Sequence, residues 1–119
     1  MIASVYLNRL AAKLPLQADP TVQYAIATRD GPAAVAYNYW KQDLSPTDLQ
    51  IDSPFNTYQV PGLPPAPICN PGEASIKAVL QPAKTDYMYF VANTDGSGSH
   101  LFAKTLDEHN ANVAKVNGR

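Results

Sequence analysis

The chain has 119 residues, enough to bury one hydrophobic core but too few for two domains of ordinary size. Nine Lys and Arg against ten Asp and Glu give a formal net charge of -1, and no long basic run is present to neutralise phosphates or anionic lipid. We therefore expect no nucleic-acid partner. No stretch approaches the roughly 20 apolar residues needed to cross a bilayer, so no membrane span is expected in these residues.

Two helices are predicted in the N-terminal third. Apolar residues at helical spacing predict a first amphipathic helix of about three turns, which ends at Pro15. Asp19 followed by Pro20 is typical of an N-cap and a first helical position, so a second, short helix is expected to run through Ile26. The alanine-rich and aromatic segment 33–42 fits either a short helix or a loop.

The middle of the chain is dominated by proline. Ser45 before a proline and an acidic residue predicts a very short helix. Prolines recur through residues 52–71, which excludes regular helix and interior strand and predicts a long structured loop. Asn70 is a candidate N-cap for a helix Glu73–Leu80, which Pro82 ends.

The C-terminal part is predicted to form a β-hairpin followed by a helix. Alternating aromatic and aliphatic residues predict strands at 87–92 and 100–103, joined by a glycine-rich turn. Thr105 and Glu108 form a capping box for a last helix. Its residues expected to face inward are Leu106, Val113 and Val116. The predicted fold class is α+β, with several short helices around a small antiparallel β-sheet.

Glutamates are common general acids and bases in enzymes, and the chain holds two of them. Glu73 lies in the first turn of a predicted helix and Glu108 in a capping box, so a capping role accounts for both. Asp19 fits either an N-cap or an active-site contact. No residue within the chain is assigned as catalytic on this basis.

Metal and cofactor chemistry finds little support in the sequence. His100 and His109 lack acidic neighbours at ligand spacing, and we expect no metal site. Cys69, the single cysteine, has no disulfide partner and is interpreted as a packed thiol. Lys84 is interpreted as a surface or loop residue rather than a Schiff-base lysine, and no cofactor is expected.

A polar array in the proline-stiffened loop is the clearest candidate for ligand binding. Asn56, Thr57 and Tyr58 offer an amide and two hydroxyls, the kind of rigid array that can hold sugar hydroxyls and N-acetyl groups. A turn stabilised by its own asparagine explains the same residues. Gln17 and Gln23 are weaker candidates of the same kind.

Five ordered blocks of the sequence resemble one known family. Residues 16–24 read Leu-Gln-Ala-Asp-Pro-Thr-Val-Gln-Tyr, and residues 55–71 contain Asn-Thr-Tyr and Gly-Leu-Pro-Pro. The others are Ala-Ser-Val-Tyr-Leu-Asn-Arg-Leu in the first helix, Pro-Ala-Lys-Thr-Asp-Tyr followed by Tyr-Phe-Val-Ala, and a closing His-Asn-Ala-Asn-Val. With this order and spacing the chain resembles the endolytic murein transglycosylase family, also called the YceG-like family.

The resemblance implies a lysozyme-like transglycosylase cleft that cleaves the bond between N-acetylmuramic acid and N-acetylglucosamine within nascent glycan strands. The products would carry 1,6-anhydro-N-acetylmuramic acid ends. The family's general-acid glutamate lies upstream of the segment that matches the first helix, hence upstream of Met1. We therefore expect residues 1–119 to form a single YceG-like domain, truncated at its N-terminus and inactive in isolation. The cleft residues implied for substrate binding are Gln17, Asp19, Asn56, Thr57 and Tyr58.

The resemblance also implies partners and a location. Peptidoglycan glycan strands would be the substrate, and cell-wall synthases the neighbouring proteins. The full-length protein is expected at the extracytoplasmic face of the bacterial inner membrane, with this fragment soluble. Two alternatives stay open: a glycan-binding module without catalysis, and, from an older label of the family, a pyridoxal-phosphate-dependent aminodeoxychorismate lyase, which would need a lysine that forms a Schiff base.

Overall fold

The computed structural model describes residues 1–32, 41 and 43–117. The chain divides into two compact units, one made of Met1–Ala12 and Pro71–Arg119 and the other of Lys13–Asn70. Helices and an antiparallel strand pair occur among the described residues, which confirms the predicted α+β class. No helix in this described part is long and apolar enough to cross a bilayer. The expectation of one domain over residues 1–119 stays a prediction.

The sheet of the first unit is a hairpin of β1 (Tyr89–Ala92) and β2 (His100–Ala103). The strands are antiparallel, with Tyr89 opposite Ala103 and Ala92 opposite His100, which confirms the predicted hairpin. Gly96 and Gly98 in the connecting turn have φ angles of 79° and 74°, which side chains with a Cβ rarely adopt.

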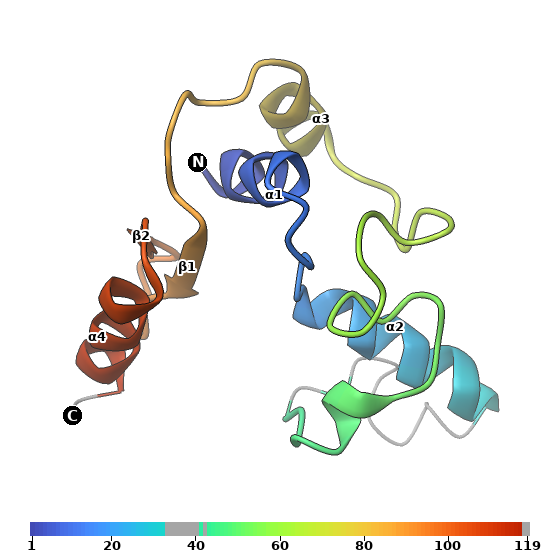
Figure 1. The fold of residues 1–119 in the computed structure, drawn as a ribbon. Coiled ribbons are helices and arrows are strands. Elements are labelled where there is room, and N and C mark those ends of the chain that lie inside the picture. The colour runs from blue at the N-terminus through green and yellow to red at the C-terminus, as the bar shows by residue number, and fades with distance from the viewer. Residues whose placement is uncertain (33–40, 42, 118–119) are drawn as a thin grey trace. The chain divides into compact units, whose positions relative to one another are not determined.

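Helix α4 (Leu106–Val116) packs on this hairpin (Figure 1). The predicted capping box is confirmed: Thr105 Oγ1 accepts a hydrogen bond from the Glu108 amide at 3.2 Å, and the Glu108 carboxylate accepts one from the Lys104 amide at 2.9 Å. Val113 and Val116 are half-buried. The inward orientation predicted for Leu106 is wrong, because this first helical residue lies at the open end of the helix and is 53% exposed.

Helix α1 (Ile2–Ala11) is fixed by polar side chains to the segment that leads into β1. Asn8 Nδ2 donates to the carbonyls of Thr85 and Tyr87 at 2.8 and 2.9 Å. Arg9 Nη1 donates to the Met88 carbonyl at 2.8 Å, and the guanidinium lies 5.2 Å from the centre of the Tyr89 ring. The first predicted helix is therefore confirmed, and its polar residues anchor it.

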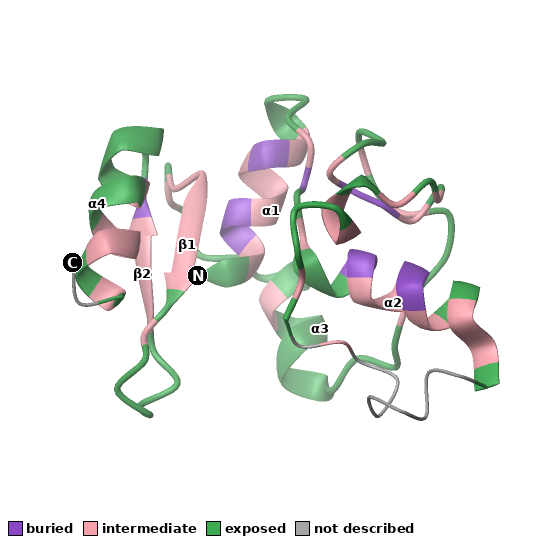
Figure 2. Cartoon of the chain, turned by 90° about the horizontal axis from the view of Figure 1, so that it is seen from below, coloured by how far each residue is buried: buried purple, intermediate pink, exposed green. Residues whose placement is uncertain are grey.

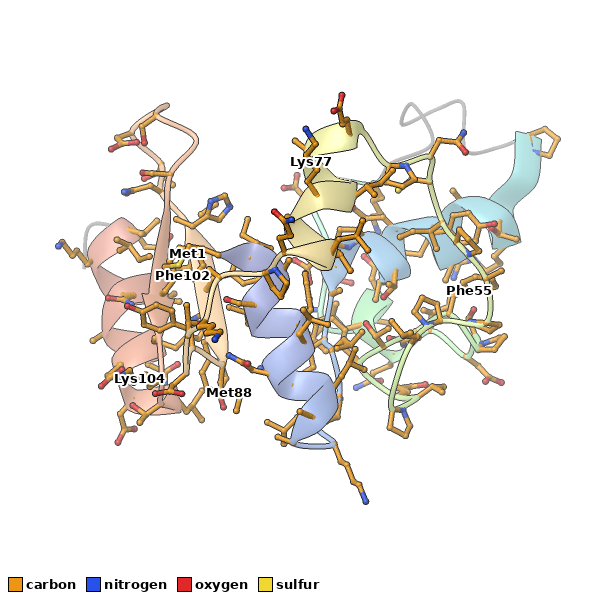
Figure 3. All side chains as sticks on the ribbon, turned by 90° about the horizontal axis from the view of Figure 1, so that it is seen from above. Met1, Phe55, Lys77, Met88, Phe102 and Lys104 are labelled. Carbon is orange, nitrogen blue, oxygen red and sulfur yellow. The ribbon has the colours of Figure 1, made fainter. Side chains whose placement is uncertain are left out.

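Helix α3 (Glu73–Leu80) has the predicted bounds and lies beside α1 (Figure 1). Its N-cap is Gly72, without a side-chain capping bond, so the expected cap by Asn70 is wrong. None of its residues is buried, and Figure 2 shows the helix mostly as exposed. Lys77, labelled in Figure 3, pairs with Glu73 at 2.9 Å across one turn.

The second unit is built around α2 (Asp19–Asp30), which is longer than the short helix predicted. Its buried face, purple in Figure 2, is formed by Thr21, Val22, Ala25 and Ile26. Phe55, labelled in Figure 3, packs on Tyr24 with ring centres 4.9 Å apart, so the loop covers one side of the helix.

Short local hydrogen bonds organise the rest of this unit. The predicted very short helix is the 3-10 turn η2 (Asp48–Gln50). Ser45 and Asp48 exchange bonds, from the Ser45 amide to the carboxylate at 2.9 Å and from the Asp48 amide to the hydroxyl at 3.1 Å. The open choice between helix and loop at 33–42 falls, except for Lys41, outside the described residues.

The packed environment predicted for Cys69 is wrong, because the thiol is free and exposed. Cys69 ends a proline-rich stretch in which most residues from Pro61 onward are exposed. Proline fixes the backbone of this stretch locally, without requiring burial of the side chains that follow.

Candidate functional site

The five residues predicted to bind substrate lie together in the unit Lys13–Asn70, on two segments far apart in sequence. One segment enters α2, and the other is the loop that follows η2. The Gln17 amide donates to the Thr57 carbonyl at 3.2 Å, and the Ala18 amide donates to Thr57 Oγ1 at 2.9 Å. Tyr58 Oη donates to Asp19 Oδ1 at 2.5 Å. The structure therefore brings all five predicted residues into one cluster.

Asn56 forms the interior of this cluster and is 0% exposed. Its Nδ2 donates to the Leu49 carbonyl at 3.0 Å and to the Ile51 carbonyl at 2.9 Å. Its Oδ1 accepts from the Tyr58 amide at 3.0 Å. The amide thus satisfies three backbone groups of its own loop, as expected for a turn stabilised by an asparagine.

Thr57 is 1% exposed and contacts the first turn of α2. Its hydroxyl lies 2.8 Å from that of Thr21, which is 5% exposed. Sequence reasoning did not single out Thr21, although it lies within the signature block at residues 16–24. Its pairing with Thr57 joins positions 36 residues apart, so no local pattern could reveal it.

Asp19, Gln17 and Tyr58 form the accessible part of the cluster. Asp19 and Gln17 are exposed, and Tyr58 is half-buried. Asp19 is the first residue of α2, and the N-cap is Ala18, so its carboxylate serves as the acceptor for Tyr58 rather than as the N-cap. An amide, a carboxylate and a phenol on one surface can exchange hydrogen bonds with an uncharged, hydroxyl-rich ligand.

Gln17 has an unusual backbone. Its φ angle is 49°, in the left-handed region that residues other than glycine seldom occupy. Such a conformation costs on the order of 1 kcal/mol and persists where surrounding contacts impose it. The bond from the Gln17 amide to Thr57 is one such contact. The exposed side chain of Gln17 therefore leaves the backbone in a direction that the loop fixes.

The charged residues near this cluster stabilise the local structure of the unit. Lys41 Nζ lies 2.7 Å from Asp48 Oδ2, and this bond, with that from Ser45, lowers the pKa of Asp48 from 3.8 to about 2. The other candidate glutamine, Gln23, donates to the Lys41 carbonyl at 3.0 Å. Both contacts tie the segment before η2 to its own unit.

Other candidate residues lie in the first unit. Glu73 is exposed and paired with Lys77, Glu108 caps α4, and Lys84 is exposed. The His109 ring stacks on Tyr89 with centres 5.2 Å apart, and burial together with the positive charge of Arg9 lowers the pKa of His109. In the described ranges no group of three or more metal-ligating side chains converges.

The fold and the site define a class: an α+β protein whose accessible polar cluster suits a hydroxyl-rich ligand. Comparison with protein families assigns residues 1–115 to the YceG-like family, and the chain belongs to that family. This confirms the resemblance found in the sequence.

Two named bacterial proteins are similar in sequence to this chain, in agreement with the family assignment. The chain is 49% identical over 109 residues to the endolytic murein transglycosylase of Bacillus subtilis strain 168, covering 92% of this chain and 27% of that protein. It is 33% identical over 115 residues to the protein of the same name from Streptococcus pneumoniae serotype 2 strain D39, covering 97% of this chain and 20% of the relative. The chain thus spans about a quarter of the length of these relatives.

A solved structure is also similar. A crystal structure of a YceG-like protein from Listeria monocytogenes superposes with a TM-score of 0.76 at 48% sequence identity. The superposition covers 93% of this chain and 31% of that one. At this level of identity the structural similarity and the family assignment support each other.

Proposed function

We propose that the chain is part of the catalytic domain of a peptidoglycan lytic transglycosylase. The observation that carries this proposal is the 49% identity to an endolytic murein transglycosylase over 92% of the chain. The proposed substrate is the glycan strand of nascent peptidoglycan. The proposed reaction cleaves between N-acetylmuramic acid and N-acetylglucosamine and leaves a 1,6-anhydro end.

The reaction needs no water and no metal in its balanced form. A carboxylic acid gives its proton to the glycosidic oxygen as the bond from that oxygen to C1 of the muramic residue breaks. The C6 hydroxyl of the same sugar then bonds to C1, and its proton returns to the carboxylate. One carboxyl group can therefore act first as acid and then as base.

The polar cluster at the start of α2 supports binding. Gln17, Asp19 and Tyr58 are accessible and would exchange hydrogen bonds with sugar hydroxyls and N-acetyl groups. Asn56 and Thr57, whose polar atoms bond within the unit, would hold the loop that carries Tyr58. In this proposal the two buried residues act on the substrate through their exposed neighbours.

The general acid is proposed to be a glutamate outside these 119 residues. Both glutamates of the chain already have structural partners: Glu73 pairs with Lys77, and Glu108 caps α4. The longer relatives, of which this chain matches about a quarter, have room for that residue elsewhere. The proposed location of the full-length protein is the extracytoplasmic face of the bacterial membrane, near cell-wall synthases.

A glycan-binding module is the second candidate for the isolated chain. The observation that favours it is that both glutamates have structural partners, whereas the polar cluster is accessible. The two functions differ in whether bonds are broken, not in the surface used.

One experiment separates the candidates. The chain, both alone and within the full-length protein that contains it, is incubated with purified, uncrosslinked glycan strands. Binding is measured by isothermal titration calorimetry, and products are analysed by mass spectrometry. Products with anhydro ends, 18 Da lighter than hydrolysed ends because no water is added, would establish transglycosylase activity. Saturable binding by both forms with no such products from either would support the binding module. Absence of both binding and products would overturn both candidates.

A further inference from the structure

Two buried hydroxyls close a ring of hydrogen bonds at the start of α2. The Ala18 amide lies 2.9 Å from Thr57 Oγ1, which lies 2.8 Å from Thr21 Oγ1. Thr21 Oγ1 in turn lies 2.7 Å from the Ala18 carbonyl, so the ring begins and ends on one residue. The two threonines are 5% and 1% exposed, and the ring is therefore shielded from water.

Chemistry fixes the direction of every bond in this ring. An amide nitrogen can only donate and a carbonyl oxygen can only accept. The Ala18 amide therefore donates to Thr57, the Thr57 hydroxyl to Thr21, and the Thr21 hydroxyl to the Ala18 carbonyl. Each hydroxyl donates once and accepts in the ring, an arrangement in which neighbouring bonds polarise and strengthen one another.

The ring holds the backbone that carries the accessible side chains. Ala18 lies between Gln17, with its left-handed φ of 49°, and Asp19. Thr57 is followed by Tyr58, whose hydroxyl donates to Asp19. The two chain segments next to the ring, residues 17–19 and 57–58, therefore carry the side chains that are proposed to contact the ligand.

We propose that Thr21 is a positioning residue for glycan binding, acting with Thr57 through the hydroxyl ring. The inference rests on the proposed function of this cluster and adds a residue that does not itself contact ligand. The ring sets the distance and angle between Gln17 and the Asp19–Tyr58 pair. These groups are then already arranged before the ligand binds, so the binding free energy is not reduced by the cost of ordering them.

The test compares two substitutions of Thr21 with a control substitution at another threonine of the same helix. Thr21→Val keeps the shape of the side chain and removes the hydroxyl, whereas Thr21→Ser keeps the hydroxyl. The control is Thr28→Val, an exposed threonine of the same helix. Glycan-strand affinity is measured by calorimetry on variants that show cooperative thermal unfolding. We expect Thr21→Val to weaken binding about tenfold, Thr21→Ser to stay within about threefold of wild type, and Thr28→Val to match wild type.

A double-mutant cycle separates positioning from general stability. If Thr21 acts through the accessible pair, Thr21→Val should weaken binding less than about twofold in a Tyr58→Phe background. Equal losses in both backgrounds would show that Thr21 does not act through Tyr58 and would overturn the inference. If Thr21→Val does not fold, Thr21→Cys replaces it, since a thiol is a weak donor, and should bind more weakly than Thr21→Ser.

Failure of the proposed function and failure of the positioning role give different results. If the wild-type chain binds no glycan, the proposed function fails and the positioning role fails with it. If wild type binds and folded Thr21→Val or Thr21→Cys binds equally well, only the positioning role fails.

Discussion

The two units of the chain differ in the balance of hydrogen bonds and ring contacts that hold them. In Lys13–Asn70 the largest fully buried side chains include Asn56 and Thr57 beside Val22 and Ile26, and buried hydrogen bonds fix the loop on α2. In the other unit, rings pack along the hairpin, as Tyr87 does on Phe102 in a tilted arrangement with ring centres 5.4 Å apart. Hydrogen bonds are directional, so the unit Lys13–Asn70 suits the exact placement of the groups proposed to bind ligand, and ring packing suits a scaffold.

Asn56→Ala should have the largest effect and should act on one unit. It leaves the Leu49 and Ile51 carbonyls and the Tyr58 amide without their side-chain partner, which costs about 3 kcal/mol of unfolding free energy. Chemical denaturation measures the loss. Hydrogen exchange should rise in residues 16–30 and 48–60 but not in the hairpin. Uniform loosening of both units would contradict the division, and Asn110→Ala at an exposed site of α4 is the control.

Arg9→Met should have the next largest effect and should act on the other unit. It removes the bond to the Met88 carbonyl and the contact with the Tyr89 ring while keeping an unbranched side chain, at a cost of about 2 kcal/mol. Hydrogen exchange should now rise in α1 and β1. The control Arg29→Met removes an exposed pair with Asp30 and should cost under about 0.5 kcal/mol. Equal losses for the two variants would show that Arg9 has no special anchoring role.

Acidification should weaken the first unit through His109. Because burial and Arg9 lower the pKa of His109 below 6.5 in the folded state, the unfolded chain binds its proton first as pH falls. Stability should therefore be full above pH 6.5 and fall as pH drops through the folded pKa. Tyr89 of β1 stacks on the imidazole ring, and the charged group that acts on it is Arg9 of α1.

The variant His109→Phe checks this origin, since it keeps a ring on Tyr89 and cannot titrate. Urea denaturation at pH 8 and pH 5.5 should show a smaller pH effect for His109→Phe than for wild type. His100→Phe, which leaves His109 in place, should keep the wild-type dependence. An unchanged slope in His109→Phe would assign the effect to other groups. The loss should be smaller than that for Arg9→Met because the ring is only half-buried.

Glu73→Gln should have the smallest effect. The side chains of Glu73 and Lys77 are 81% and 73% exposed, and such a pair across one helical turn contributes about 0.3 kcal/mol. Thermal unfolding should shift by less than 2 °C for this contribution. Lys77→Gln should behave in the same way. A loss of stability as large as that expected for Arg9→Met would contradict this ranking.

Local signals in the sequence were enough for much of the fold. Prolines on either side bounded α3 although its expected cap is absent, Ser45 marked the start of η2, and the Thr105–Glu108 pair marked the start of α4. The alternation predicted strands at 87–92 and 100–103, and the observed hairpin pairs Tyr89–Ala92 with His100–Ala103. These features depend on contacts within a few residues, which composition and spacing report directly.

Burial was harder to predict because it depends on distant partners. Asn56 is a polar residue in a proline-rich loop, yet it is fully buried since three backbone groups of its loop require its amide. The burial of Thr21 depends on the hydrogen bond between its hydroxyl and that of Thr57, which lies 36 residues away in the sequence. The exposure of Leu106 and Cys69 is the reverse case, in which an apolar residue type finds no neighbours to cover it.

The exposed thiol of Cys69 makes the molecule chemically addressable at one point. With a single cysteine in its sequence, the chain accepts one maleimide dye or spin label, in the loop that ends the unit Lys13–Asn70. The same thiol has no internal partner to oxidise with. Under oxidising conditions two chains would therefore be joined by a disulfide between their Cys69 thiols, and a reductant would separate them.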